Sequence, residues 1–278
     1  MPAQPPNTSG IEPVKGLKHP AVKEARELST AVGRRKHRAF ALEGLKNLQL
    51  ALNIQRSVRS VFISQKALPN FPESTLRQLA DLNTPTYSAT SGIIAKILSI
   101  RYEPDAECVS VIEMDEWPLE RLASANPGFV LVCDHVVDPR NLGVIIRTAD
   151  AASASALLLT PGCADPYARA AVRASTGSIL SIPVIPVRSA KACLHNLREL
   201  GLTILASSAV EGKPIWEHDL TRPAALIIGN ETSGVSPQLR SLADLTLRIP
   251  IHGSAHSLNV AVACGVILFE RLRQSKHS

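Results

Sequence analysis

An amide, a glycine and a guanidinium stand at the start of an apolar helix pattern, in the stretch DHVVDPRNLGVIIRTADAA (134–152). Asn141 offers an amide, Gly143 leaves room beside the backbone, and Arg147 brings a planar fork of N–H donors. Together with the free N–H groups of a helix N-terminus, these parts suit the binding of a phosphate or a hydroxyl. A structural interpretation is also open, in which Asn141 caps the helix and Arg147 pairs with Asp150.

The spacing separates Arg147 from the helix face that would contact a sheet. Arg147 shares a face with Gly143, one turn earlier. Helical side chains lean toward the N-terminus, so we expect the guanidinium to pass over this glycine and emerge near Asn141. The stripe that packs on the sheet follows the i, i+3, i+4, i+7 pattern and comprises Leu142, Ile145, Ile146 and Ala149.

A second segment whose residues could take part in binding or catalysis is ALIIGNETSGV (225–235), where an apolar strand runs into polar residues. Gly229 permits a close approach of the backbone to a ligand. Glu231 places a carboxylate where the strand ends, and Gly234 follows shortly. Taken alone, the segment also fits an ordinary strand–turn–helix connection, in which Ser236-Pro237 begins the next helix.

The third segment, RIPIHGSAHSLNVAVACGVILFERL (248–272), places a long apolar helix after a glycine-containing loop. Ser257 or His256 is expected to cap this helix. Residues 258–269 are apolar on every side except at Asn259, which indicates a helix buried between the sheet and a partner subunit. A buried Asn259 needs a dedicated hydrogen-bonding partner.

The elements that would position these segments alternate regularly from residue 129 onward. Helical patterns separate short apolar runs that are typical of buried parallel strands. This βαβ series predicts an α/β domain with a mostly parallel sheet and helices on both faces. The expected strands are FVLVC, ALLLT, IPVIPV, LTILAS, AALIIG and LTLRIPI.

Four parts are predicted along the chain. Residues 1–14 are expected to form a disordered arm, and residues 15–116 a small α/β domain. Proline, glycine and polar residues in 117–128 indicate a linker, and 129–278 form the second domain.

Positive charge is concentrated near the N-terminus. The net charge is +6, and residues 15–60 hold 11 Lys and Arg against 3 acidic residues. Such a cluster is an electrostatic footprint for a polyanion, although a solvated charged turn would explain it equally well. The densest part is GRRKHR, and its candidate polyanion-binding residues are Arg34, Arg35, Lys36 and Arg38.

Several classes of function are disfavoured. No apolar run approaches the roughly 20 residues of a membrane span, and the N-terminus does not resemble a secretory signal. Five scattered cysteines indicate reduced thiols and a cytoplasmic protein without a disulfide framework. We expect no metal site, because His252 and His256 lack a nearby cysteine or carboxylate to complete one. A Gly-rich dinucleotide fingerprint and a Walker loop are also missing.

Taken in order, the three segments resemble the three motifs of the SpoU family of RNA ribose methyltransferases, in the SPOUT superfamily. NLGVIIRTA matches the form N-x-G-x-x-x-R-T-A, and GNETSG matches G-N-E-G-x-G except at Thr232. IPIHGSAHSLNVAVA matches the third motif, with Ile251 in place of a methionine. The N-terminal part is similar to a substrate-binding domain that is often fused ahead of this catalytic domain.

The resemblance implies a fold and a set of ligands. In this family the C-terminal sheet domain is tied into a deep trefoil knot, binds S-adenosylmethionine and forms a homodimer. By position, Gly229, Ile249 and Leu258 would hold the methyl donor. The ribose would be handled by Asn141 and Arg147, with Glu231, Ser257 and Asn259 in support.

The activity implied is methyl transfer to a ribose 2′-hydroxyl in RNA. Ribosomal RNA is favoured because minimal tRNA-modifying members usually lack the N-terminal domain. The alternatives are a tRNA 2′-O-methyltransferase and a non-catalytic RNA-binding or ribosome-assembly protein with the same fold. Because arginine stays protonated in proteins, we interpret Arg147 as an electrostatic stabiliser rather than a general base.

Overall fold

The computed structural model describes residues 10–101, 106–115, 117–124 and 127–276. The chain forms two compact units, each of which has its own sheet. Unit 1 comprises Met1–Asp115 together with Tyr167–Arg173, and unit 2 comprises Glu116–Pro166 and Ala174–Ser278. Residues 1–9 of the expected arm lie outside the described residues.

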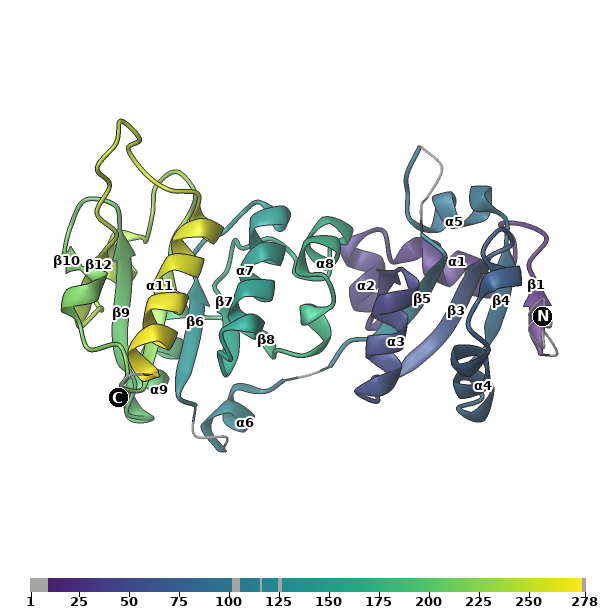
Figure 1. Ribbon diagram of the computed structural model, residues 1–278, viewed down its shortest axis with the longest axis horizontal. Helices are drawn as coiled ribbons and strands as arrows, with labels where there is room; N and C mark the ends of the chain where they lie inside the picture. The colour runs from purple at the N-terminus through teal and green to yellow at the C-terminus, as the bar shows by residue number, and fades with distance from the viewer. Residues whose placement is uncertain (1–9, 102–105, 116, 125–126, 277–278) are drawn as a thin grey trace. The chain divides into compact units, whose positions relative to one another are not determined.

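Unit 1 is built on a five-stranded mixed sheet (Figure 1). The strands β1, β4 and β3 run parallel, whereas β5 is antiparallel to both β3 and β2. In spatial order the strands are β1 (Ile11–Pro13), β4 (Thr86–Ala89), β3 (Val58–Ser64), β5 (Cys108–Glu113) and β2 (Ala39–Glu43).

Helices cover both faces of this sheet because the strands alternate between two cores. Phe62 of β3 packs with residues of α1 and α5, whereas its neighbours Val61 and Ile63 pack with residues of α3 and α4. The helices are α1 (Pro20–Glu27), α2 (Ala31–His37), α3 (Leu45–Asn53), α4 (Glu73–Asp81) and α5 (Ser91–Ile97), with a 3₁₀ turn, η1 (Leu68–Asn70).

Part of the expected arm is ordered. Residues 11–13 form β1, which pairs with β4, and the Val14 amide donates to the Ser88 carbonyl over 2.9 Å. Val14 itself is buried in the core. The prediction of disorder up to residue 14 is therefore wrong for residues 11–14, because the backbone of this segment pairs with the edge of β4 and Val14 packs into the core.

The expected linker is also partly structured. Residues Leu119–Ser124 form a short helix, α6, and Leu122 is buried in the core of unit 2. The guanidinium of Arg121 lies over the Trp117 ring, 4.1 Å from its centroid. These contacts hold the segment, which composition alone marked as loop.

Unit 2 contains a seven-stranded sheet in which every pair of neighbours is parallel. The α/β class and the six expected strands are thereby confirmed; the added strand β10 is only two residues long. In spatial order the strands are β10 (Lys213–Pro214), β12 (Leu245–Arg248), β9 (Thr203–Ser208), β11 (Ala224–Ile228), β6 (Phe129–Cys133), β7 (Ala156–Leu159) and β8 (Val184–Pro186).

The helices of unit 2 cover both faces of its sheet. The pair α7 and α11 pack side by side (Figure 1). Leucines of α9 and α10 pack on the opposite side, in a core with strands β6, β7, β9 and β11. The helices are α7 (Pro139–Ala151), α9 (Ala190–Glu199), α10 (Pro237–Arg240) and α11 (Val260–Ser275), with 3₁₀ turns η2 (Ser178–Leu180) and η3 (Ile215–Glu217). A further helix, α8 (Arg169–Ser175), belongs to unit 1 as far as Arg173.

Parallel strands all end at the same edge of the sheet, so the loops after β6, β9, β11 and β12 leave from one side. The first of the three chemically promising segments begins in the loop after β6, the second runs from β11 into the loop that follows it, and the third begins at the last residue of β12. No helix in the described part of the chain is long and apolar enough to cross a membrane.

Candidate functional site

The carboxylate of Glu231 joins the first two segments. Its Oε1 accepts hydrogen bonds from the Asp138 backbone N–H and from Asn141 Nδ2, both over 3.1 Å. Its Oε2 accepts from the Val137 backbone N–H and from Asn230 Nδ2, both over 3.3 Å. Glu231 therefore fixes the loop before α7 and the side chain of Asn141 at the same time.

These contacts also determine the charge state of Glu231. Burial raises the pKa of its carboxyl, but the hydrogen bonds from Asn141 and from the backbone outweigh burial and leave the pKa below the usual value. Glu231 is consequently ionised at neutral pH. Each oxygen of Glu231 accepts from two N–H donors, so a carboxylate is needed here. The amide of a glutamine could accept these hydrogen bonds only at its single oxygen.

Asn259 brings the third segment to the same place. Its Nδ2 donates to Asn141 Oδ1 over 3.0 Å, and its Oδ1 caps α11 by accepting from the Ala261 and Val262 backbone N–H groups. The expected dedicated partner thus exists. However, Asn259 is exposed rather than buried in the single chain, and Asn259 caps the helix instead of Ser257 or His256.

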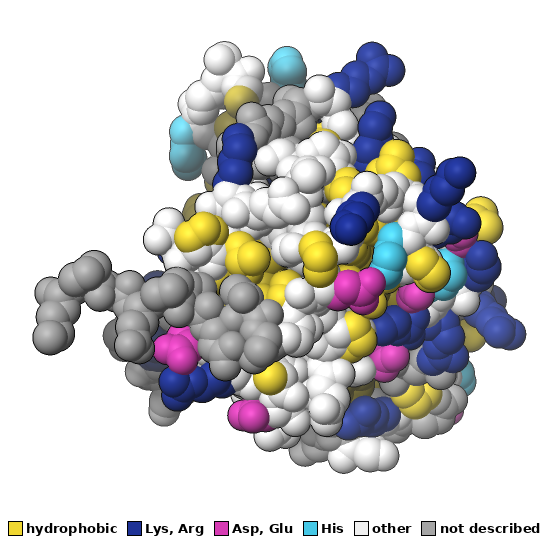
Figure 2. All heavy atoms as spheres, turned by 90° about the vertical axis from the view of Figure 1, so that its right-hand side faces the viewer, with side chains coloured by type: hydrophobic (Ala, Val, Ile, Leu, Met, Phe, Trp, Pro, Cys, Tyr) yellow, Lys and Arg dark blue, Asp and Glu magenta, His cyan; other side chains and the backbone are white. Residues whose placement is uncertain are grey.

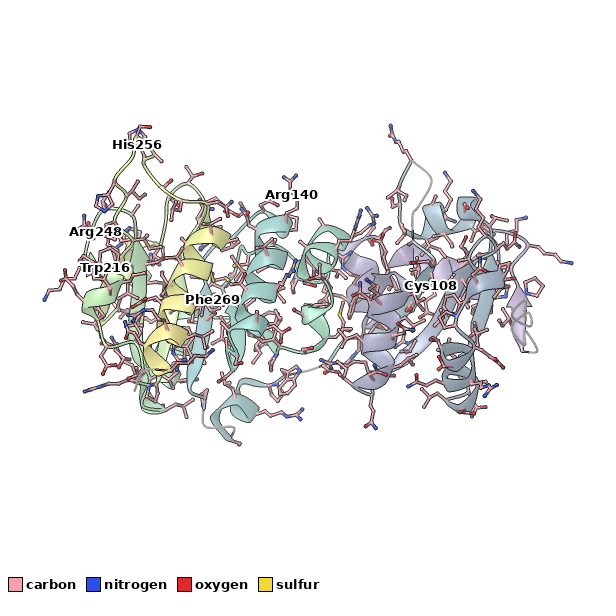
Figure 3. All side chains as sticks on the ribbon, in the orientation of Figure 1. Cys108, Arg140, Trp216, Arg248, His256 and Phe269 are labelled. Atoms are coloured by element: carbon pink, nitrogen blue, oxygen red, sulfur yellow. The ribbon has the colours of Figure 1, made fainter. Side chains whose placement is uncertain are left out.

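Asn141 is not a helix cap. The cap of α7 is Asp138, whose side chain accepts from the Arg140 N–H over 2.8 Å, and Pro139 begins the helix. Arg140 pairs with Asp138, and its side chain extends outward from the start of the helix (Figure 3). The amide of Asn141 is instead held between Glu231 and Asn259.

Arg147 lies on the exposed side of α7. In the described part of the chain it forms no ion pair with Asp150, so the structural interpretation of this arginine fails as well. Its charge remains available to a ligand.

A cavity of about 220 Å³ lies beside this network. It is formed by the loop after β9, by the glycine loop after β11 and by the segment after β12, and its lining includes Gly229, Ile249 and Leu258. An adjoining hollow is lined by Asn141, Glu231, Ser257 and Asn259, together with Leu258, which faces both. The structure thus brings together every predicted site residue of the three segments except Arg147, which lines neither space.

The glycine at position 229 is required by the backbone around it. A Cβ atom here would lie 2.0 Å from Gly234 C and from Val235 N. The loop closes so tightly because Asn230 and Gly234 exchange two backbone hydrogen bonds, of 3.0 and 2.9 Å. The cavity wall at Gly229 is therefore bare backbone, which suits recognition of a ligand through main-chain groups.

Thr232, the departure from the second motif, leaves this loop intact. Its backbone N–H donates to Asn230 Oδ1 over 2.9 Å, as does that of Ser233 over 3.1 Å. The tight turn is made by Gly234, whose φ is +70°. A threonine fits at position 232 because the left-handed backbone conformation is required at Gly234, two residues later.

Sequence analysis did not identify the part of the cavity contributed by Ser207–Val210. These residues carry no motif, but they are the last two residues of β9 and the two that follow it. The rule that ligands bind at the carboxyl ends of parallel strands was the signal that could have found them.

The predicted RNA-binding cluster is only partly available. Arg34 is buried and donates to the Leu28 carbonyl over 2.8 Å, so it supports the fold rather than contacting a phosphate. Lys36 and His37 both bind Glu27 Oε2 over 2.7 Å. These two contacts lower the pKa of Glu27 to about 2. Arg38 ends α2 in a left-handed conformation and is exposed, as is Arg35.

Other cations of unit 1 are free to bind a polyanion. Lys23 and Arg26 on α1 are exposed and, like Arg35, have no ion-pair partner within the described ranges. Figure 2 shows that lysine and arginine side chains gather on one side of the face of unit 1 that is turned to the viewer. The basic residues of α1 were not predicted to bind a polyanion, because in the sequence they alternate with Glu24 and Glu27.

Comparisons with known proteins agree with this geometry. The model of the SpoU rRNA Methylase family matches residues 128–269. The chain is 31% identical to an uncharacterized tRNA/rRNA methyltransferase of Synechocystis sp., over 97% of this chain and 96% of the relative. It is 32% identical to a 23S rRNA (guanosine(2553)-2′-O)-methyltransferase of Bacillus subtilis, over 93% and 98% respectively.

The fold is likewise similar to solved structures. A rRNA methyltransferase from Sinorhizobium meliloti with bound AdoMet superposes with a TM-score of 0.83 at 30% identity, covering 95% of this chain and 98% of that one. A SpoU methyltransferase from Streptomyces viridochromogenes in complex with AdoMet gives a TM-score of 0.81 at 28% identity, covering 94% and 100%. These likenesses extend over both units.

Proposed function

The chain belongs to the SpoU rRNA methylase family, and from this premise we propose that it methylates a ribose 2′-hydroxyl of ribosomal RNA with S-adenosylmethionine as donor. The observation that carries the proposal is the Asn141–Glu231–Asn259 network beside the Gly229 cavity. Similarity to relatives that are named as 23S rRNA 2′-O-methyltransferases favours ribosomal RNA over tRNA.

The Gly229 cavity fits the methyl donor. Its wall combines bare backbone at Gly229 with the apolar side chains of Ile228, Ile249 and Leu258, which suits an adenosine group. Gly229, Ile249 and Leu258 would hold the donor. When bound, its sulfonium supplies an electrophilic methyl group.

The adjoining hollow fits the ribose. One N–H of the Asn141 amide is used by Glu231, and its second N–H remains to orient a hydroxyl oxygen. Glu231 and Asn259 keep the amide from turning, so they act as positioning residues, and Ser257 lies exposed at the rim. Arg147 contributes positive charge that favours the developing alkoxide but accepts no proton; the proton of the hydroxyl passes to solvent water.

We also propose a homodimer formed through unit 2. Val262, Val266 and Phe269 make an apolar stripe on α11, with exposures of 53%, 38% and 53%. Val144 extends the apolar surface onto the neighbouring α7. An apolar surface of this kind is typical of a subunit interface, and Figure 3 marks the position of Phe269 on α11.

Replacing Phe269 by aspartate is expected to dissociate the dimer. Losing the burial of a phenylalanine and placing a charge in the interface costs about 3 kcal/mol or more, so the dimer Kd should rise at least ~100-fold. Light scattering coupled to size-exclusion chromatography measures this. Val32→Asp, on the exposed side of α2, is the matched control and should leave the mass unchanged. A monomeric wild type, or a dimeric Phe269→Asp variant, would contradict the proposal.

Unit 1, which contains the predicted 15–116 domain, is proposed to dock RNA through its free cations. Removing Arg35 should weaken binding of 23S rRNA and reduce the slope of log K against log salt by about 1, because one phosphate contact is lost. Fluorescence anisotropy over a salt series measures the slope. Arg77→Ala on α4, where Arg77 already pairs with Glu73, is the control. Binding that barely changes with salt would exclude this surface.

Two further features of the family are proposed for this chain. We infer a trefoil knot in the C-terminal part of unit 2, which the likeness to SpoU structures supports. A cytoplasmic location is inferred from the ribosomal substrate.

The function is tested with purified protein, methyl-labelled S-adenosylmethionine and unmodified transcripts of 23S rRNA and tRNA. We expect label in one 23S rRNA nucleotide, resistant to alkaline cleavage on its 3′ side, and none with Asn141→Ala. Label in tRNA alone would identify the tRNA alternative. RNA binding without any label would indicate a non-catalytic assembly protein.

A further inference from the structure

A second cavity of unit 2, of about 520 Å³, opens at the carboxyl ends of β6 and β7. None of its lining residues lines the Gly229 cavity or the adjoining ribose hollow. We call it the His135 cavity; its polar lining includes Asp134, His135, Thr160, Ser189, Lys191 and Ser236.

Asp134 forms the buried base of one wall. Its Oδ2 accepts from the Ser236 backbone N–H over 2.8 Å, and its Oδ1 accepts from His135 Nδ1 over 2.8 Å and from Thr160 Oγ1 over 3.4 Å. Burial raises the pKa of this carboxyl, but the hydrogen bonds from Ser236 and His135 lower it below the usual value. Both oxygens are therefore occupied by the wall, and the carboxylate presents no free acceptor to a ligand.

His135 is fixed by three contacts. Nδ1 faces Asp134, and the ring lies so close to Gly162 that a Cβ there would come 2.7 Å from His135 Cδ2. The His135 carbonyl accepts from Asn230 Nδ2 over 2.9 Å. Because Nδ1 carries the hydrogen that Asp134 accepts, Nε2 is the ring nitrogen left for a ligand, and more than half of the side chain is exposed.

Uncompensated positive charge lies on the opposite side of the cavity. Lys191 stands in the first turn of α9, and Arg188 immediately precedes the Ser189 cap. Neither has an acidic partner in the part of the chain that the structure describes, and the first turn contains no acidic residue. A cation at a helix N-terminus is unfavourable by about 0.3–1 kcal/mol, so this arrangement becomes favourable only when an anion is present.

The cavity is adjacent to the ribose hollow. His135 lines the cavity and Val137, two residues later, lines the hollow. The two Cα atoms lie at most about 7 Å apart, which is the scale of one step along an RNA backbone. Asn230 contacts both His135 and Glu231, so the two spaces share one rigid wall.

We propose that the His135 cavity binds a phosphodiester of the RNA substrate beside the nucleotide whose ribose lies at Asn141, with Lys191 and, in its imidazolium form, His135 Nε2 as donors. This subsite rests on the proposed function, since it assumes an RNA substrate. It adds a contact from unit 2 that fixes the register of the RNA, whereas unit 1 supplies general affinity.

The test uses full-length protein and an unmodified 23S rRNA transcript. Lys191→Ala should raise the KM for RNA about 5–10-fold and reduce the salt slope of RNA binding by about 1. His135→Asn should raise the same KM several-fold, and asparagine tolerates the positive φ of 55° at this position. Neither change should alter the KM for S-adenosylmethionine, and Lys191→Ala should not lower the melting temperature. The matched control is Arg222→Ala, which precedes β11 at the opposite edge of the sheet.

The outcomes separate this inference from the proposed function. An active wild type whose RNA KM and salt slope are unchanged in both variants overturns the subsite and leaves the function standing. A wild type without methyl transfer overturns the function, and the anisotropy measurement alone then decides the subsite. If Arg222→Ala raised the KM for RNA as much as Lys191→Ala, the loss would follow from net charge alone, and this result would also overturn the subsite.

Discussion

Replacing Arg147 by lysine is expected to lower kcat for RNA methylation by about 10²–10³-fold, with little change in the Kd for S-adenosylmethionine. None of the residues that line the ribose hollow is a lysine or an arginine, and Arg147 lies on the exposed side of the neighbouring α7. Two carboxylates line the hollow: Asp138 pairs with Arg140, and Glu231 accepts from four N–H donors, so neither is free to accept the proton of the hydroxyl. In the proposed mechanism, stabilisation of the forming alkoxide is assigned to Arg147.

Lysine keeps the charge but loses the planar fork of donors. A guanidinium can contact an alkoxide and a neighbouring phosphate at the same time, whereas an ammonium is a compact point charge on a flexible stem. Single-turnover rates with saturating RNA isolate this step from binding. Arg140→Lys, at the exposed start of the same helix, is the control, because Arg140 already pairs with Asp138. A lysine variant with near-full activity would sink every mechanism that needs the fork.

The sequence was sufficient to predict the α/β class, because buried parallel strands are continuous apolar runs. It also identified the segments that form the site, because motif spacing places them at strand ends. It did not predict which side chains cap the helices and which contact one another in the site. Asp138 and Asn141 are both good capping residues by type, and only the geometry of the loop shows that Asp138 caps α7. This frees Asn141 for Glu231, a partner 90 residues away.

Charge density was a poor guide to the RNA-binding surface for a similar reason. Arg34, Arg35 and Lys36 are equivalent in the sequence, but the helical period turns Arg34 into the interior and leaves Arg35 exposed. Lys36 meets Glu27, nine residues earlier, through the turn between α1 and α2. Burial and pairing depend on how consecutive elements pack, which a local count of charges does not contain.

His135 was missed because neither its type nor its neighbours form a motif. Its importance depends on Gly162 and Asn230, which are far apart in the chain and meet it only in the folded structure. The apolar pattern of α11 predicted a helix buried on nearly every side. However, it overstated burial in the single chain, where Val262 and Phe269 are exposed.

Replacing Gly229 by alanine is expected to abolish donor binding more completely than any side-chain truncation in the cavity. The new Cβ would lie 2.0 Å from two backbone atoms of the facing strand of the loop, Gly234 C and Val235 N. Backbone cannot move aside as a side chain can, so the two hydrogen bonds between Asn230 and Gly234 must open. We expect the Kd for S-adenosylmethionine to rise by about 100-fold or more, equivalent to about 2.7 kcal/mol, as measured by calorimetry.

Gly128→Ala is the matched control for this loss. Gly128 precedes β6 at the opposite edge of the sheet, and a Cβ there meets nothing within 4 Å, so the Kd should stay unchanged. The opened loop also releases Asn230 and Glu231, and through Glu231 the amide of Asn141. Gly229→Ala should therefore lower the single-turnover rate even where saturating donor restores binding. A variant that binds the donor normally would show that the loop relaxes without loss, and that the bare backbone at Gly229 is not what the donor requires.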